Sequence, residues 1–102
     1  MPERRTAQRF RTNLNARWET LGSQGRGGVS DLSSTGCFVL SGANLSPGEF
    51  MRLQLVASDQ IVSLWGHVVY SVNEIGFAVR FVFGNEADKR SLERLIEFVR
   101  DS

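Results

Sequence analysis

The residues of this sequence that could do chemistry fall into two short clusters. The first is a group of three arginines, Arg4, Arg5 and Arg9, near the N-terminus. The second runs from Asp31 to Gly36 (DLSSTG) and combines a carboxylate with hydroxyl groups and a glycine. Arginine presents a planar fork of N–H donors that matches phosphates and the acceptor edge of guanine, whereas a carboxylate accepts hydrogen bonds. Together the clusters predict a site for an anionic ligand that carries both donors and acceptors.

Motifs of common enzymes and cofactor sites are missing from the sequence. No serine lies in a GxSxG elbow, and no glycine-rich loop matches GxGxxG or GxxxxGK[ST]. His67 is the only histidine and Cys37 the only cysteine, so neither a metal nor another cofactor is predicted. We expect Cys37 to be a small buried core residue. The chain is expected to be a binding protein and not an enzyme.

Basic residues are concentrated at the N-terminal end, although the formal net charge is only +1. Residues 1–30 contain six arginines and two acids, and the remaining residues carry three more acids than bases. Eleven of the twelve basic residues are arginine, the type that forms bidentate contacts with phosphates and guanine. Because the near-neutral total gives little long-range attraction to a polyanion, nucleic acid is not an expected partner.

Alternation of apolar and polar side chains predicts β-strands along most of the chain. The predicted strands run over residues 10–18, 29–32, 37–40, 50–55, 61–72 and 75–83. Residues 22–28 (GSQGRGG) contain four glycines and no periodicity, which predicts a flexible hairpin connection. Residues 33–36 predict a tight corner, with Gly36 where a positive φ is needed. The two clusters therefore lie just before the first strand and at the corner after the second.

An amphipathic helix is predicted at the end of the chain, over about residues 85–100. Asn85 is the expected N-cap, and Leu92, Leu95, Ile96 and Val99 recur at helical spacing. Six short strands and one helix in 102 residues favour a single domain. The predicted fold class is mainly β, a six-stranded antiparallel β-barrel with a C-terminal α-helix packed over or beside it.

Neither a signal-peptide core nor a membrane span is recognisable in the sequence. The N-terminal segment MPERRTAQRFRTN has no apolar stretch. Elsewhere, no apolar run approaches the about 18 residues that a spanning helix needs. We therefore expect a cytoplasmic protein without membrane insertion.

The order and spacing of the two clusters match a known family. Arg5 and Arg9 form an RxxxR motif, and Asp31 to Gly36 form a [D/N]xSxxG motif. The later segment GFAVRF is also similar to a strand of that family, and a helix follows it there as it does here. The sequence resembles the PilZ family over nearly its whole length. The resemblance divides the chain into a flexible Arg-rich ligand-binding arm, residues 1–10, and a PilZ-like barrel with its helix, residues 10–102.

The resemblance implies a receptor for the bacterial second messenger bis-(3′-5′)-cyclic dimeric GMP (cyclic di-GMP) that relays the signal to an unidentified downstream protein. It implies that Arg5 and Arg9 are the principal guanine and phosphate ligands. Arg4 would add stacking or a further contact. Asp31 and Ser33 would complement the donors of guanine, whose N1 and N2 both donate, or would contact the ligand backbone.

Gly36, Tyr70 and Arg4 have more specific roles in this interpretation. Gly36 would let the backbone turn without a Cβ that blocks the ligand, and Tyr70 would either stack on a base or serve as a barrel aromatic. The position before RxxxR is associated in the family with binding one ligand or an intercalated pair, and Arg4 there favours the pair. Signalling would occur by closure of the arm onto the barrel when its arginines engage the ligand.

Two other functions remain open. The first is a PilZ-like adaptor that contacts other proteins and does not bind nucleotide. The second is a small barrel for single-stranded nucleic acid, which the arginines and aromatic residues would suit but the near-neutral charge disfavours. Strong, salt-sensitive binding of generic oligonucleotides would favour the nucleic-acid barrel.

Overall fold

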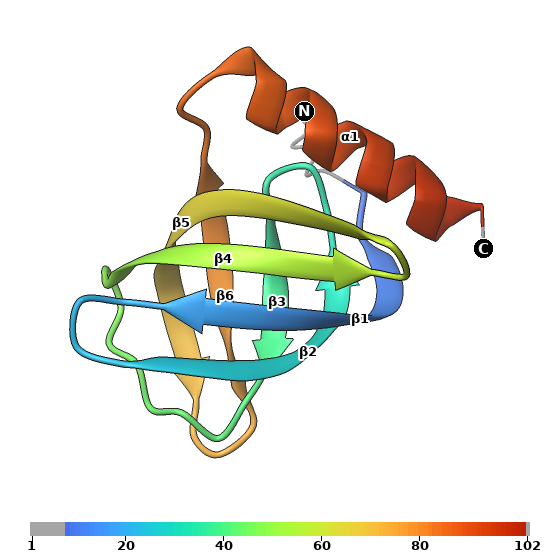
Figure 1. Ribbon diagram of the computed structural model, residues 1–102. Helices are drawn as coiled ribbons and strands as arrows, with labels where there is room; N and C mark the ends of the chain where they lie inside the picture. Colours follow the sequence, from blue (N-terminus) through green and yellow to red (C-terminus); the bar gives the residue numbers. More distant parts are fainter. Residues whose placement is uncertain (1–7, 102) are drawn as a thin grey trace, which may run out of the picture.

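The computed structural model describes residues 8–101, which form six strands and one helix (Figure 1). In chain order, the elements are β1 (Phe10–Glu19), β2 (Gln24–Leu32), β3 (Gly36–Leu40), β4 (Phe50–Ala57), β5 (Gln60–Val72), β6 (Gly76–Val82) and α1 (Glu86–Arg100). Neighbouring strands pair antiparallel and close into a barrel in the order β1-β2-β3-β6-β5-β4. The predicted six-stranded barrel with a C-terminal helix is confirmed.

The strand β1 illustrates how alternation builds the barrel. Leu14, Ala16 and Trp18 point inward and are buried, whereas the residues between them are exposed. The other elements complete one core, whose largest fully buried side chains are Phe77, Leu32, Met51, Leu53, Leu55, Leu64, Leu92, Leu95, Val29, Val39 and Val68. Because successive side chains of a strand point to opposite faces, the remaining side chains form the outer surface on which a ligand could bind.

The glycine-rich segment is a strand over most of its length, so the prediction of a flexible connection is wrong. Gly25 and Gly27 belong to β2 and pair in register with Trp18 and Ala16 of β1. A Cβ at Gly25 would lie 2.6 Å from the Trp18 indole, and one at Gly27 would clash with the Leu40 carbonyl oxygen. Gly25 makes room for the Trp18 side chain, and Gly27 makes room for the closely approaching Leu40 backbone. Glycines placed for this reason produce no alternation of apolar and polar residues in the sequence.

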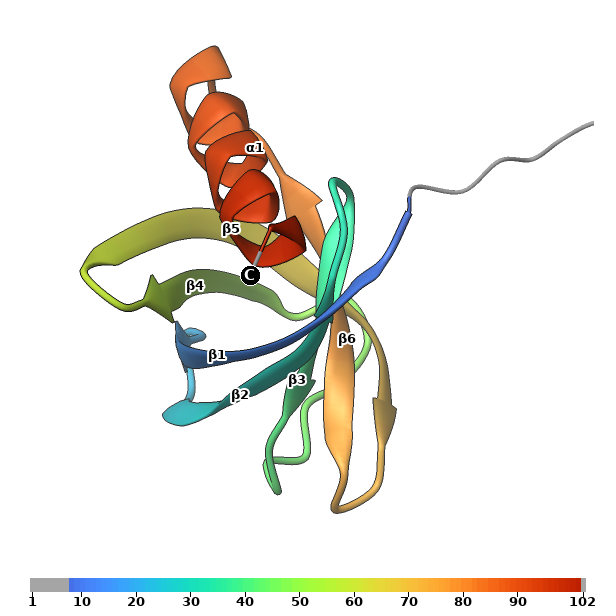
Figure 2. The same ribbon diagram turned by 90° about the vertical axis from the view of Figure 1, so that its right-hand side faces the viewer.

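The helix α1 lies across one end of the barrel (Figures 1 and 2) and contacts β1 and β5. Leu92 and Leu95 are buried in the core, and Ile96 and Val99 pack against it. The Asn85 side chain accepts a hydrogen bond of 2.9 Å from a backbone N–H of the first turn, which confirms the predicted N-cap. Within residues 8–101, no helix has the length and apolar character needed to cross a membrane.

Candidate ligand-binding site

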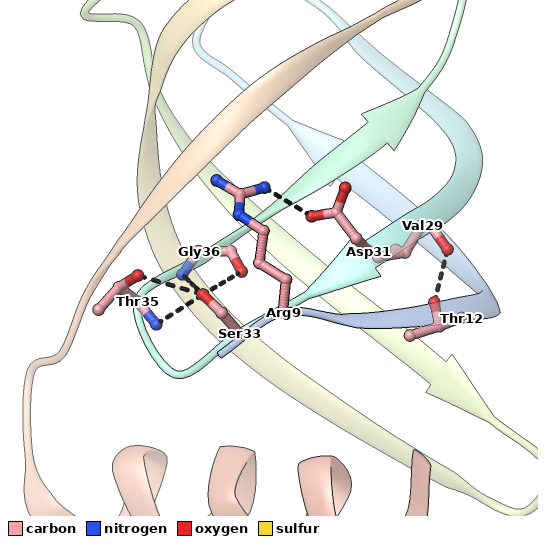
Figure 3. Close-up of polar contacts among 7 residues, drawn as sticks. All are labelled: Arg9, Thr12, Val29, Asp31, Ser33, Thr35 and Gly36. Atoms are coloured by element: carbon pink, nitrogen blue, oxygen red, sulfur yellow. Dashed lines mark hydrogen bonds and ion pairs between the residues drawn. The ribbon is translucent and has the colours of Figure 1, made fainter. Parts of the chain in front are cut away.

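The two clusters meet where β1 starts and β2 ends. Arg9, the residue before β1, donates from Nη1 to Oδ1 of Asp31 over 2.8 Å (Figure 3). The Arg9 side chain is 66% exposed and that of Asp31 is 28% exposed. Exposed ion pairs of this kind add only about 0–1 kcal/mol to stability, so this contact contributes little to holding the barrel together. The other two predicted arginines, Arg4 and Arg5, lie outside the described residues.

Irregularities in two strand pairings set the direction of these side chains. The register shifts between Arg11 and Leu14 in the β1–β2 pairing, and between Val29 and Asp31 in the β2–β3 pairing. The Thr12 hydroxyl lies at the first shift, where it donates to the Val29 carbonyl oxygen (Figure 3). It also accepts from the Leu14 N–H. An extra residue bends a strand and re-aims its neighbours. The shifts thus orient both Asp31 and the chain that enters β1.

Ser33 holds the corner between β2 and β3. Its hydroxyl accepts from the backbone N–H groups of Thr35 and Gly36, each over 3.2 Å, and shares a 3.1 Å hydrogen bond with the Thr35 hydroxyl (Figure 3). The Phe81 N–H of β6 donates to the Thr35 carbonyl oxygen over 2.8 Å. Ser33 is only 4% exposed. Its side chain therefore fixes the backbone of the corner from inside, while Asp31 faces solvent beside it.

Gly36 is required for a different reason from the one predicted. Among the described residues, the glycine with a positive φ is Gly48. Gly36 instead begins β3 opposite Arg80 of β6, and a Cβ there would clash with the Val79 carbonyl oxygen. The expectation of a positive φ at Gly36 is therefore wrong. The glycine allows the backbones of β3 and β6 to approach closely next to the site.

Tyr70 lies on the outer face of the barrel in the same row as Asp31. Asp31, Phe38, Ala78 and Tyr70 are successive Cα partners across β2, β3, β6 and β5. Tyr70 is 49% exposed, and its ring centroid lies 6.4 Å from that of Phe38. The small side chain of Ala78 lies between the two aromatic strand positions. The row forms a surface with a carboxylate at one end and a tyrosine at the other.

Two arginines that the sequence analysis did not assign to the site lie at its edges. Arg11 is the Cα partner of Asp31, and it lines a hollow of about 440 Å³ together with Arg9 and Asp31. Arg80 is exposed on β6 and in register with Gly36. Alternation in β1 places Arg11 outward, and Arg80 is the one charged residue within β6 (GFAVRFV). Both positions could have been found from strand alternation alone.

Cys37 lies on the inner side of β3, behind the site, and is 4% exposed. Burial, and secondly the Asp31 carboxylate, raise the pKa of its thiol far above the ordinary value, while Arg9 has a smaller opposite effect. The prediction of a small buried core residue is confirmed. Within residues 8–101, no group of three or more His, Cys, Asp or Glu side chains could hold a metal ion.

The described part of the chain is thus a closed six-stranded barrel on whose outer surface exposed arginines surround one carboxylate. The family model of the PilZ domain matches residues 3–98. The chain belongs to the PilZ domain family. No match was found among curated proteins.

Solved PilZ structures share this fold at low sequence identity. The PilZ domain of YcgR from Escherichia coli, solved with c-di-GMP, has a TM-score of 0.81 at 18% identity, covering 97% of this chain and 93% of that one. The PilZ domain of CeSA from a cellulose-synthesising bacterium has a TM-score of 0.78 at 18% identity, covering 92% and 99%. The K. pneumonia MrkH–c-di-GMP complex has a TM-score of 0.72 at 19% identity, covering 93% and 51%.

Proposed function

We propose that this PilZ protein is a receptor for cyclic di-GMP, which it binds through its RxxxR and DxSxxG motifs, and that it relays the signal to a partner protein. Membership of the PilZ family supports the proposal, as do the neighbouring folds solved with c-di-GMP. The observation that carries it is the 2.8 Å contact between Arg9 and Asp31, which joins one motif to the other on the outer surface of the barrel.

Arg9 and Asp31 present complementary halves of a guanine-binding pair. Guanine accepts hydrogen bonds at O6 and N7 and donates them from N1 and N2. Arg9 has donors beyond the one that Asp31 accepts, so it can bind guanine or phosphate oxygens while it stays beside the carboxylate. Asp31 would accept from the guanine donors. Arg5 would supply a second fork for guanine or phosphate, and Arg4 would stack on a base or add a further contact.

The remaining site residues have supporting roles in this proposal. Ser33 fixes the corner with its buried hydroxyl, and Gly36 keeps β3 close to β6 without a Cβ beside the ligand. Arg11 and Arg80 place positive charge on either side of the corner, where it would attract the ligand phosphates. Tyr70 would stack on a base at the far end of the row that Asp31 begins.

The signal would come from closure of the arm, residues 1–10, onto this surface. Ordering a segment costs conformational entropy, which the arginine contacts with the ligand must offset. The closed arm would cover the corner and change the surface that a partner protein meets. Two stacked cyclic di-GMP molecules would suit the site best, because Arg4 can stack on a base and offset the charge of two dianions.

Isothermal titration calorimetry with cyclic di-GMP tests the proposal, with GTP and a linear GMP dinucleotide as controls. Wild type would be compared with Arg9→Ala and Asp31→Ala, and with Arg94→Ala on α1 as a matched control for loss of one exposed arginine. We expect each site variant to weaken binding of cyclic di-GMP about tenfold to a hundredfold. The reason is that each variant loses a hydrogen bond to a charged group, which contributes about 1.5–3 kcal/mol. The control should bind like wild type.

Thermal unfolding of the same variants separates binding from folding. Because the Arg9–Asp31 pair is exposed, its loss should change stability by no more than about 1 kcal/mol. Absence of saturable heat from folded wild-type protein would reject the receptor and favour the adaptor that does not bind nucleotide. A stoichiometry of two ligands per chain would support the stacked pair, whereas one would reject it.

A further inference from the structure

A second group of exposed arginines lies on the outer surface of β1, β2, β4 and β5, away from the candidate site. We call it the arginine–tryptophan face and define it by Arg17, Arg26, Arg52, Phe50 and Trp65. Arg17 is the Cα partner of Arg26 across β1 and β2, and Arg52 is the Cα partner of Trp65 across β4 and β5. Figure 1 shows β1, β2 and β4 side by side, with the β1–β2 turn at the left.

The aromatic part of this face is already packed into a fixed arrangement. The rings of Phe50 and Trp65 stack with centroids 5.3 Å apart and planes 7° apart. The Arg52 guanidinium lies over the Trp65 ring, 5.8 Å from its centroid. Phe50 is nevertheless 52% exposed and Trp65 42% exposed. Tryptophan and arginine are the residue types that most often dominate binding at protein interfaces, and here they are oriented before any partner arrives.

The arginines of the face form no ion pair among residues 8–101, although Glu19 is the Cα partner of Arg52 across β1 and β4. The ion pairs within that part of the chain are Arg9–Asp31 and Arg100–Asp101, and neither includes Arg17, Arg26 or Arg52. Arg17 and Arg26 lie directly opposite each other across β1 and β2. Like charges in such positions destabilise the strand pairing. An external anionic group would relieve this repulsion.

Two hollows meet at Arg52: one of about 430 Å³ is lined by all three arginines, and one of about 630 Å³ is lined by Arg52 together with apolar side chains. The lining of the larger hollow includes Phe50, Trp65 and Leu21, the last of which is fully exposed. Glu19 and Glu49 also line the larger hollow. The face therefore combines an apolar hollow with positive charge on one side and two carboxylates at its border.

The face is well separated from the candidate cyclic di-GMP site. Arg9 precedes β1, whereas Arg17 and Glu19 lie at the other end of the same strand. The eight residue steps from Arg9 to Arg17 span at most about 26 Å at ~3.3 Å per residue, because the register shift between Arg11 and Leu14 bends the strand. A molecule on the face would not compete with a ligand held by Arg9 and Asp31.

We propose that the arginine–tryptophan face docks an acidic segment of a partner protein, with an apolar side chain of that segment in the hollow beside Trp65. The carboxylates of the segment pair with Arg17, Arg26 and Arg52. Glu19 and Glu49 interrupt the positive charge, and the adjoining hollow is apolar. This combination favours a protein segment with separate carboxylates and an apolar side chain over a continuous polyanion such as a nucleic-acid strand or an anionic membrane. This docking is independent of cyclic di-GMP binding, so an experiment can reject one of the two proposals and leave the other unaffected.

The test uses nuclear magnetic resonance of the isotope-labelled full chain with a synthetic peptide in which glutamates flank a central leucine and phenylalanine. The Trp65 indole N–H is the side-chain reporter, because Trp65 is 42% exposed on the face. We expect saturable shifts of this N–H and of the β1, β2 and β4 amides near the face, with the α1 amides unchanged. Peptides with lysine for glutamate, or serine for the apolar pair, should bind at least tenfold more weakly.

A matched pair of double variants locates the binding. Arg52→Ala with Trp65→Ala removes one arginine and one exposed aromatic from the face, and should weaken peptide binding at least tenfold. Arg94→Ala with Phe98→Ala removes the same types from the exposed side of α1 and should leave binding unchanged. All four side chains are partly or fully exposed, so both variants should fold, which their amide spectra report.

Several results would overturn the proposal. Absence of saturable shifts at millimolar peptide, or equal loss in both double variants, would reject docking on this face. Tighter binding of oligothymidylate or phosphatidylglycerol vesicles at the same residues would assign the face to a polyanion. Concentration-dependent dimerisation that Arg52→Ala with Trp65→Ala abolishes would assign it to a second copy of the chain.

Discussion

Arg9 is the residue at which the arm joins the barrel, and its contact with Asp31 gives the guanidinium a set direction before any ligand arrives. A side chain that is already oriented loses less conformational entropy on binding than one that is free. The contact is exposed and therefore weak, and it uses only one N–H donor of Arg9, so the proposed ligand could bind the remaining donors while Arg9 stays beside Asp31. In the proposed site, the pair would orient the Arg9 guanidinium without blocking it.

Behind the same site, Cys37 is predicted to be chemically inert in the native protein. The thiolate is the reactive form of cysteine, and burial raises the pKa of this thiol so that it stays protonated at neutral and mildly alkaline pH. A thiol reagent such as 5,5′-dithiobis(2-nitrobenzoic acid) at pH 8 should label the native protein far more slowly than the protein in urea. Rapid stoichiometric labelling without denaturant would show that β3 opens next to the site.

The identities of the candidate site residues could be predicted from sequence, but their contacts could not. Strand alternation and the order of the motifs indicate that Arg9 and Asp31 lie outward near the same end of the barrel. The direction in which they point depends on register shifts around Thr12 and before Asp31, and no periodicity marks those shifts. The buried hydroxyl of Ser33 was similarly unpredictable, because a serine in a turn looks the same whether it faces a ligand or the backbone.

At the scale of elements, glycines of β2 and β3 allow neighbouring strands of the barrel to approach closely. Gly27 of β2 faces the Leu40 carbonyl oxygen at the end of β3, as Gly36 of β3 faces the Val79 carbonyl oxygen of β6. At each contact, one strand supplies a glycine and the next supplies a backbone oxygen. These close approaches keep β2, β3 and β6 together under the surface that carries the candidate site.

Gly27→Ala should therefore destabilise the barrel. The added Cβ would clash with the Leu40 carbonyl oxygen and lie 3.1 Å from a Val39 methyl group. Overpacking of this kind costs about 1–3 kcal/mol, to be measured by urea unfolding. Gly22→Ala is the matched control, because nothing lies within 4 Å of its Cβ position, and it should change stability by less than about 1 kcal/mol. Equal effects of the two substitutions would contradict this role of Gly27.

The number and order of the elements were predictable, and the extent of β2 was not. Alternation, short apolar runs and the turns between them identified all six strands, and the change to helical period together with Asn85 located the start of α1. The strand β2 was predicted to start at Val29, since a run of glycines normally indicates a loop. Its glycines are instead explained by the Trp18 indole and the Leu40 backbone, which are distant in sequence and meet them only in the closed barrel.

At the scale of the whole molecule, β1 links two surfaces with different chemistry. Its first end carries the proposed cyclic di-GMP site, and its last residues border the arginine–tryptophan face, which we propose docks an acidic partner. The helix α1 covers one end of the barrel (Figure 2). It also contacts β1, which pairs with β2 and β4. A barrel without a free sheet edge is suited to this arrangement, because partners must bind its side chains and not its backbone.

The most direct test of the account follows the backbone amides of the labelled full chain as cyclic di-GMP is added. We predict saturable shifts at residues 31–36 and at the start of β1, together with new protection of residues 1–10 against hydrogen exchange. Amides at the far end of β1 and on the arginine–tryptophan face should change little. No shifts in folded protein, shifts centred away from residues 31–36, or an arm equally protected with and without ligand would contradict it.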